Sequence, residues 1–217
     1  MKHTPSQLSK SAFSLIELIA VISIIAIIAA FAIPAASTIL RGSQLTQGAQ
    51  LISGQLSLAR QQALTRNHSI EVRFFRYADS EVPGEQADSP ESGKFRAIQM
   101  FEVLENGVPV PLSKMETLPN SIIFNDDQLS SIIMEKDPQP PSDTDPEMAR
   151  GVKKNYEYVA FRFRPDGSTD LNPIKQWFVT LHSITDQIEG SVPPSNFFTV
   201  QIDPVSGSTR EYRPTAS

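Results

Sequence analysis

The hydrophobic pattern divides the 217-residue chain into three regions. Residues 12–36 are almost continuously apolar and read AFSLIELIAVISIIAIIAAFAIPAA. In residues 37–67, apolar side chains recur every three or four positions, which is the period of a helix with one covered face. After this segment, short alternating apolar runs are separated by turn residues, as is typical of antiparallel strands. The pattern therefore predicts an α+β fold, in which one long N-terminal helix packs on an antiparallel β-sheet domain.

The continuous apolar run predicts a transmembrane helix over residues 13–36. Its 24 residues would extend roughly 36 Å as an α-helix, enough to cross a hydrocarbon core of about 30 Å. Lys2 and Lys10 precede the run and Arg41 follows it. The positive-inside rule therefore places the N-terminus in the cytoplasm and the remainder of the chain outside. Pro34 removes a backbone hydrogen bond and predicts a helix kink near the far end of the span.

A single carboxylate, Glu17, interrupts the apolar run. An ionised side chain at mid-membrane costs about 2.5–3.5 kcal/mol on insertion scales, so such a residue usually has a function and a cationic partner. In a stack of parallel helices, the nearest cation would be the N-terminal amine of a neighbouring subunit. That pairing would neutralise both charges and fix the register of the helices. Two simpler interpretations stay open: a secretory signal peptide cleaved near Ala32 or Ala36, and a plain signal anchor with Glu17 near the membrane interface.

The helix is expected to continue into solvent over residues 37–67 as an amphipathic segment. Its narrow apolar stripe consists of Leu45, Ala49, Ile52, Leu56, Ala59 and Ala63. Three glycines in the same segment each lower helix stability by about 1 kcal/mol relative to alanine. The helix must therefore be held by packing, and we expect the protein's own sheet to cover the stripe.

Turn residues separate the expected strands of the domain at residues 68–217. Strands are expected near residues 70–74, 95–103, 108–112, 156–163, 177–181 and 197–202, with short apolar runs at 122–124 and 132–134. The sequence Glu105-Asn106-Gly107 is a hairpin signal. Pro109 and Pro111 place the strand after it at a sheet edge, because proline cannot donate a ladder hydrogen bond.

Composition excludes several kinds of chemistry. The chain has no cysteine, which rules out disulfides, thiolate metal sites and a cysteine nucleophile. Its formal net charge of −5 argues against a general attraction to nucleic acid. The sequence has no GxSxG, HExxH, P-loop or GxGxxG pattern, and we expect neither enzymatic activity nor a cofactor. Of the three histidines, His3 precedes the apolar run, His68 lies at an expected helix–strand junction, and His182 is expected to be half-buried in a strand.

Two loops are rich in carboxylates, at residues 79–91 and 137–147. Calcium binding stays open because hard cations prefer several oxygen ligands. Neither loop has the spacing of an EF-hand with its glycine. The expectation is that both are solvated loops, and no metal ligand is assigned.

The string from Ala12 to Leu18, followed by the apolar run and Pro34, resembles the N-terminal motif of type IV prepilins and type II secretion pseudopilins. The resemblance implies cleavage by a prepilin peptidase between Ala12 and Phe13, N-methylation of Phe13, and Glu17 as the assembly carboxylate. It also implies a leader at residues 1–12. The family usually has glycine before the cut, and Ala12 departs from that pattern.

Three further segments narrow the resemblance to the GspH/FimT class of minor pseudopilins. Residues 55–73 (QLSLARQQALTRNHSIEVR) resemble the helix-to-strand passage of that class, and residues 198–213 (FTVQIDPVSGSTREYR) resemble its closing hairpin. Residues 161–171 (FRFRPDGSTDL) are similar to Verru_Chthon cassette protein D. The resemblance implies a minor subunit of a pilus-like filament, in type II secretion or a related machine.

The same resemblance implies partners and a location. The partners would be other pseudopilins, the prepilin peptidase, and the inner-membrane assembly platform with its motor ATPase. The protein would be a single-pass protein of the cytoplasmic membrane, with its globular domain extracytoplasmic or periplasmic.

A rival interpretation is a DNA-binding minor pilin of a type IV pilus or DNA-uptake system. Its basic patch would be drawn from Arg73, Arg76, Arg96, Arg162, Arg164, Arg210 and Arg213. Such binding would weaken steeply with salt. Arginines of this kind are more often the solvent-facing side chains of strands. A membrane-anchored hydrolase is a third interpretation, for which the sequence offers no site.

Overall fold

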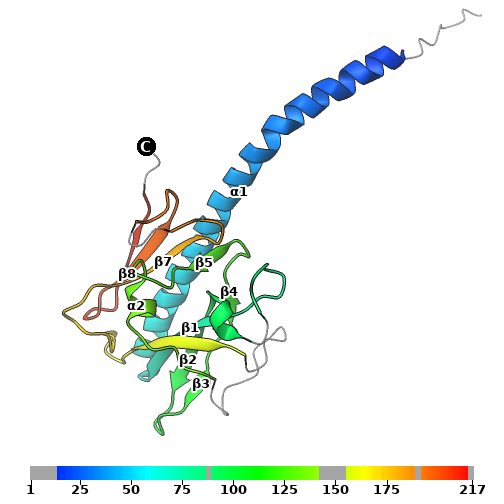
Figure 1. Ribbon diagram of the computed structural model, residues 1–217. Helices are drawn as coiled ribbons and strands as arrows, with labels where there is room; N and C mark the ends of the chain where they lie inside the picture. Colours follow the sequence, from blue (N-terminus) through cyan, green and yellow to red (C-terminus); the bar gives the residue numbers. More distant parts are fainter. Residues whose placement is uncertain (1–13, 87–88, 142–154, 189–191, 215–217) are drawn as a thin grey trace, which may run out of the picture. The chain divides into compact units, whose positions relative to one another are not determined.

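One long helix, α1 (Leu15–Arg66), precedes all the strands of the protein (Figure 1). The structure is a computed structural model that describes residues 14–86, 89–141, 155–188 and 192–214, without the side chains of residues 31–38. The chain divides into two compact units, Met1–Leu40 and Arg41–Ser217. The expected α+β architecture, with the helix first and antiparallel strands after it, is confirmed.

The first unit contributes the N-terminal part of α1. Ten large apolar side chains between Leu15 and Ile28 are 46–77% exposed there. Within the described part of the chain, no helix combines the length and the apolar character needed to cross a membrane. The transmembrane segment expected at residues 13–36 includes residue 13 and the side chains of residues 31–36, which lie outside the described residues.

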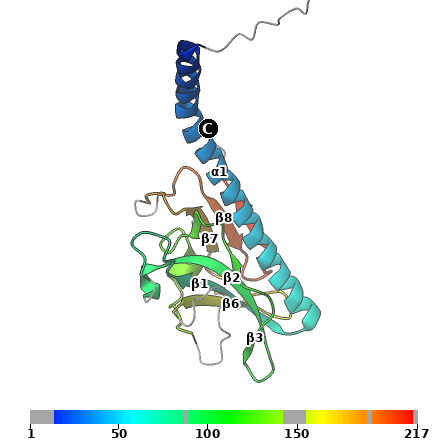
Figure 2. The same ribbon diagram turned by 90° about the vertical axis from the view of Figure 1, so that its right-hand side faces the viewer.

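The second unit contains two antiparallel sheets (Figure 2). The first has the order β3-β2-β1-β6, formed by β1 (Ser69–Tyr77), β2 (Lys94–Val103), β3 (Pro109–Pro111) and β6 (Glu157–Phe163), with β4 (Glu116–Thr117) also beside β2. The second has the order β5-β7-β8-β9, formed by β5 (Ile122–Phe124), β7 (Trp177–Ser183), β8 (Phe198–Ile202) and β9 (Thr209–Tyr212). Two helical turns, η1 (Pro90–Ser92) and α2 (Ser131–Met134), complete the described elements. The apolar run at residues 132–134 thus belongs to a helical turn, while β3 occupies a sheet edge as its prolines predict.

The second half of α1 and both sheets share one hydrophobic core. The six stripe residues predicted from the sequence are all at most 1% exposed, so the covered face is confirmed. Gly48 lies where the helix packs closely against the rest of this core. A Cβ atom there would be 3.3–3.5 Å from the side chains of Leu118, Leu181 and Ile122. Its intrinsic cost to the helix is therefore offset by close packing.

Asn67 ends the helix through its backbone conformation. Its φ of 55° is left-handed, which asparagine tolerates better than most residues and which commonly terminates helices. The residues on either side of it both bind Glu102 of β2: Arg66 Nη1 lies 2.9 Å from one carboxylate oxygen, and His68 Nδ1 lies 2.7 Å from the other. This junction fixes the direction in which the chain enters β1.

Arg60 of α1 joins two distant turns to the helix. Its Nε donates to the carbonyl of Ser206 at 2.8 Å and to that of Gly167 at 3.3 Å. Gly167 and Gly207 have φ values of 83° and 66°, in the region that favours glycine. A Cβ atom on Gly207 would lie 2.1 Å from the Gly167 carbonyl oxygen. The helix segment, the turn after β6 and the turn before β9 therefore meet at one guanidinium.

Candidate functional site

Of the residues predicted to carry function, Glu17 is the one whose side chain can be described. It lies in the first turn of α1 and is exposed. Ala12 and Phe13 lie outside the described residues, as does the side chain of Pro34, although Pro34 falls within the helical range. Cleavage, N-methylation and the helix kink therefore stay predictions.

Glu17 and Ser14 form a capping box at the start of α1. One carboxylate oxygen of Glu17, Oε2, accepts the Ser14 backbone N–H at 3.1 Å, and Ser14 Oγ accepts the Glu17 backbone N–H at 3.3 Å. This reciprocal pair satisfies two amide donors that the first turn of a helix otherwise leaves unpaired. Sequence reasoning missed the role of Ser14, although serine three residues before glutamate at the start of an apolar run is its known signature.

The capping box occupies one oxygen of the Glu17 carboxylate. The other, Oε1, has no hydrogen-bond partner among the described residues. Glu17 is also the sole ionisable residue between Ser14 and Ala30. The serine inside this segment, Ser23, already donates its hydroxyl to the Ile19 carbonyl at 2.7 Å. The side chain that can still take a charged partner here is therefore that of Glu17.

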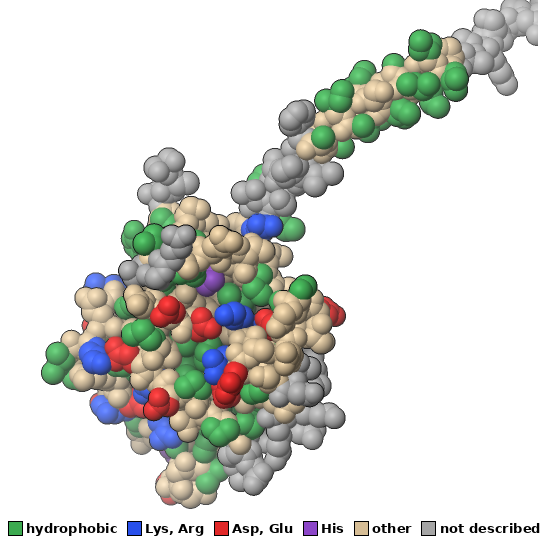
Figure 3. All heavy atoms as spheres, in the orientation of Figure 1, with side chains coloured by type: hydrophobic (Ala, Val, Ile, Leu, Met, Phe, Trp, Pro, Cys, Tyr) green, Lys and Arg blue, Asp and Glu red, His purple; other side chains and the backbone are tan. Residues whose placement is uncertain are grey.

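From Leu15 to Ala30, every residue of the helix other than Glu17 and Ser23 is apolar. Figure 3 shows hydrophobic side chains along the described N-terminal segment of the helix, and these are the ten exposed residues noted above. A helix that is hydrophobic all round normally lies in lipid or among other helices, since water would not cover such a surface favourably. A carboxylate in that setting favours a cation close by.

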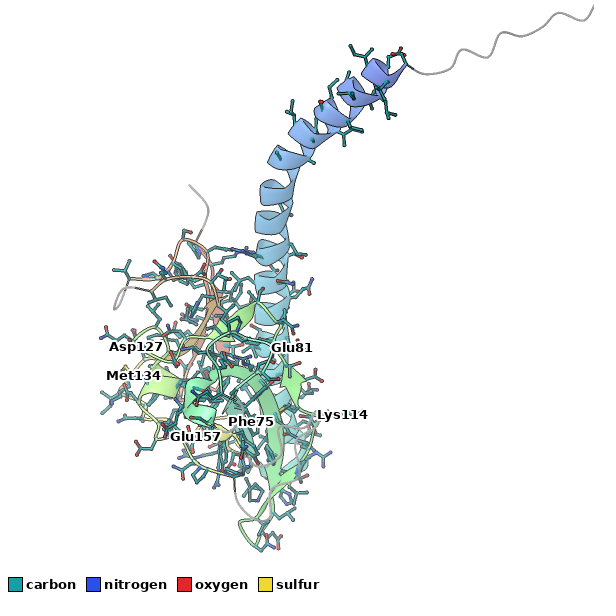
Figure 4. The ribbon with its side chains drawn as sticks, turned by 45° about the vertical axis from the view of Figure 1, so that its right-hand side comes forward. Phe75, Glu81, Lys114, Asp127, Met134 and Glu157 are labelled. Atoms are coloured by element: carbon teal, nitrogen blue, oxygen red, sulfur yellow. The ribbon has the colours of Figure 1, made fainter. Side chains whose placement is uncertain are left out.

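Several arginines of the second unit are paired with carboxylates. Four of the seven considered for nucleic-acid binding form ion pairs: Arg73 with Glu71 at 2.7 Å, Arg76 with Glu157 at 3.0 Å, Arg96 with Glu85 at 2.6 Å and Arg162 with Glu71 at 2.7 Å. Glu157 is labelled in Figure 4, on the strand beside that of Phe75. Figure 3 shows both charge signs interspersed on the face it presents. These contacts neutralise most of the basic patch that the DNA-binding interpretation requires.

Arg73 is buried instead of lying on the solvent face of its strand. Its side chain is 3% exposed, and its guanidinium carbon lies 4.1 Å from the ring centres of both Phe101 and Tyr158. The two rings and the Glu71 carboxylate together compensate the loss of water around the charge. The expectation that such arginines face solvent is therefore wrong for Arg73, and also for Arg96, which is buried beside Glu85.

The first acidic loop is tied to the sheet through Arg96. The Glu85 side chain is only 6% exposed, so the solvated-loop expectation is wrong for this residue. Its Oε2 also accepts the backbone N–H of Asp79 at 2.7 Å, which closes the loop on itself. Within the part of the chain that the structure describes, no group of three or more histidine, aspartate or glutamate side chains is placed to hold a metal ion. Much of the second acidic loop, residues 142–147, lies outside the described residues.

His182 of β7 is more buried than the sequence predicts. It is 5% exposed, and its Nδ1 lies 2.8 Å from the Ser183 carbonyl oxygen. Burial lowers its pKa below the ordinary 6.5, because desolvation disfavours the charged imidazole. The hydrogen bond to Ser183 and the charges of Asp186 and Asp126 oppose this effect, while Lys94 adds to it.

The shifted His182 pKa predicts that the folded state loses stability as the pH falls through 6.5. The unfolded chain then binds more protons than the folded chain, and the loss continues until the folded-state pKa is reached. Urea unfolding of the full chain in detergent, followed by the fluorescence of its single tryptophan, Trp177, measures this between pH 7.5 and 5. His182→Gln should flatten the pH dependence, and an unchanged dependence in that variant would contradict the assignment.

Solved structures of pilin-like subunits resemble this fold at very low sequence identity. The minor pseudopilin EpsH from the type 2 secretion system of Vibrio cholerae matches in one structure at 10% identity and a TM-score of 0.43, over 80% of this chain and 99% of that one. A second EpsH structure matches at 12% identity and a TM-score of 0.41, over 81% and 97%. The type IV minor pilin FimU from Pseudomonas aeruginosa matches at 10% identity and a TM-score of 0.41, over 80% and 90%. No protein-family model and no curated protein sequence matches the chain.

Proposed function

We propose that this chain is a minor pseudopilin, a subunit of a pilus-like filament anchored in the cytoplasmic membrane by its N-terminal helix. The observation that carries the proposal is Glu17, the sole ionisable residue in the exposed apolar segment between Ser14 and Ala30. Lipid or neighbouring helices would cover the apolar side chains, and a neighbouring subunit would supply the cation. The unit Arg41–Ser217, which has its own core, would lie on the extracytoplasmic side.

Processing between Ala12 and Phe13 would complete this site. The cut would place a new amine on Phe13, directly before Ser14. Ser14 and Glu17 both follow the cut, so the capping box would survive processing and keep Oε2 occupied. Oε1 would then accept the Phe13 amine of the adjacent subunit, which pairs two charges in a low dielectric and sets the register between helices.

The proposed role is structural: the protein would assemble with other subunits and would catalyse no reaction. The partners would be other pseudopilins in the filament, the prepilin peptidase, and the assembly platform with its motor ATPase. The machine would be a secretion system or a related pilus. We make no DNA-binding proposal, because four of the seven arginines that would form the patch already pair with carboxylates.

Mass spectrometry of the mature protein tests the processing step. When the full chain is produced with a prepilin peptidase, we expect the first residue to be Phe13 carrying one N-methyl group. Ala12→Gly, which restores the residue usual in the family, should raise the processed fraction. A chain that keeps Met1 would indicate a plain signal anchor, and one that begins after Ala32 or Ala36 would indicate a signal peptide. Either result would contradict the proposal.

A further inference from the structure

Among the described residues, the outer edge of strand β6 is paired at both ends and open at one residue between them. At one end, Tyr158 exchanges two backbone hydrogen bonds with Gln139, at 2.7 and 3.0 Å. At the other end, the chain folds back after the turn at Gly167, and Asp170 caps Arg162. The Asp170 backbone N–H donates to the Arg162 carbonyl at 3.0 Å, and its carboxylate accepts the Arg162 N–H at 2.8 Å.

Ala160 lies between Tyr158 and Arg162 in the strand, and its backbone N–H and carbonyl point toward the same edge as theirs. In an antiparallel strand, backbone groups point alternately to the two neighbours, so residues 158, 160 and 162 share one edge. Their partners in β1 are Phe75, Arg73 and Glu71, while the residues between them direct their backbone bonds toward β1. The N–H and the carbonyl of Ala160 therefore point outward, and neither has a partner among the described residues.

A hollow opens at this gap. Its volume is about 280 Å³, and β6 lines it together with Glu71, Gln139 and Asp170. That is close to the lower end of the volumes of ligand pockets. Because the side chain of Ala160 is only a methyl group, it leaves space between the larger side chains of Tyr158 and Arg162. At this hollow, the Ala160 N–H and carbonyl have no partner among the described residues, and there is space for a single amino-acid residue.

The charges around the hollow are balanced. Arg162 lies 2.7 Å from Glu71, and Glu71 also pairs with the buried Arg73. Asp170 contributes the second carboxylate of the lining. The lining therefore holds two carboxylates and one guanidinium, and Arg73, which pairs with Glu71 but does not line the hollow, supplies the second positive charge. This balance favours an uncharged ligand over an ion.

We propose that this hollow binds one residue of an extended, uncharged peptide segment from a partner protein. The backbone N–H of that residue would donate to the Ala160 carbonyl, and its carbonyl would accept the Ala160 N–H, forming a single β-bridge. Gln139 and Asp170 restrict pairing to one residue, so the site selects a short loop and excludes a full added strand. The inference depends on the edge of β6 and the residues that line the hollow, and it goes beyond the proposed membrane anchoring and processing.

Nuclear magnetic resonance of the full chain in detergent tests the site with a blocked amino acid. The probe is N-acetyl-alanine-N′-methylamide, which presents one residue's N–H and carbonyl. We expect saturable shifts of the Ala160 amide, with a dissociation constant on the order of tens of millimolar because only two hydrogen bonds form. The Ala160 amide should also exchange with solvent faster than those of Tyr158 and Arg162 in the free protein, and slow down with the probe.

Two controls isolate the backbone pairing. Binding by the variants is followed through the amides of Tyr158 and Arg162, because proline has no amide proton. Ala160→Pro removes the outward N–H and keeps the ladder hydrogen bonds to β1, and should weaken binding at least tenfold, whereas Ala160→Ser should stay within twofold. A probe methylated on the alanine nitrogen lacks the donor and should bind at least tenfold more weakly. Equal binding of the two probes by the unaltered protein would overturn the proposal, as would an Ala160 amide already protected in the free protein. Neither readout depends on Glu17 or on cleavage.

Discussion

Glu17→Gln is expected to leave the protein in the membrane fraction but to remove it from complexes with other filament subunits. Glutamine is accepted at the third position of a capping box, so the substitution keeps the helix start and deletes only the charge. A hydrogen bond to a charged group contributes about 1.5–3 kcal/mol, which corresponds to a loss of roughly 10–150-fold in association. Co-purification of tagged subunits from solubilised membranes measures the effect.

Ser14→Ala is the matched control for this prediction. It removes the serine half of the capping box and retains the carboxylate. Loss of an N-cap costs about 1 kcal/mol in helix stability, and we expect subunit association to stay within a fewfold of the unaltered protein. Normal co-purification of Glu17→Gln would contradict the inter-subunit role. A loss in Ser14→Ala as large as that in Glu17→Gln would contradict a role confined to the charge of Glu17.

Arg73→Met is expected to destabilise the second unit by about 3 kcal/mol. Removing one member of a buried ion pair typically costs 3–5 kcal/mol, and the low end applies because Glu71 keeps its contact with Arg162. In a unit of this size, the loss corresponds to a fall in Tm of roughly 6–12 °C. Thermal unfolding of the full chain in detergent can be followed through Trp177, which is the single tryptophan and is buried in the shared core.

Three variants separate the contributions around Arg73. Arg162→Met should cost less than about 1 kcal/mol, because the Arg162 side chain is 43% exposed. Arg73→Lys should lower the free energy of unfolding by an amount between those of Arg73→Met and Arg162→Met, since it keeps the charge but loses the planar contact with Phe101 and Tyr158. Adding Glu71→Leu to Arg73→Met should recover part of the stability by removing the remaining buried charge. A Tm for Arg73→Met within about 1 °C of the unaltered protein would contradict a stabilising role for the network.

Local patterns in the sequence were enough to predict the helix, its covered stripe and most strands. The stripe from Leu45 to Ala63 is buried as its spacing indicates, and the turn signal at Gly107 joins β2 to β3. These features depend on side chains a few residues apart, whose periodicity matches the geometry of one element. The capping box at Ser14 and Glu17 was equally local and could have been found by the same reasoning.

Charged residues on strands show where such reasoning ends. Alternation over residues 70–74 correctly placed Glu71 and Arg73 on the opposite face from Ile70, Val72 and Phe74, but it could not show that this face is also covered. Burial of Arg73 requires Phe101 of β2 and Tyr158 of β6, which are distant in sequence. Burial of Glu85 in the acidic loop likewise depends on Arg96 of β2.

The sequence by itself determined an apolar N-terminal helix with one carboxylate, followed by an amphipathic helix and an antiparallel strand region. Only the tertiary structure decided that the strands form two sheets, that Arg60 binds two glycine turns, and that no described residue pairs with the outward backbone groups of Ala160 in β6. The physical reason is the range of the interactions. Helical and strand periodicity arise between near neighbours, whereas strand partners, buried ion pairs and gaps in a sheet edge depend on which distant segments the fold brings together.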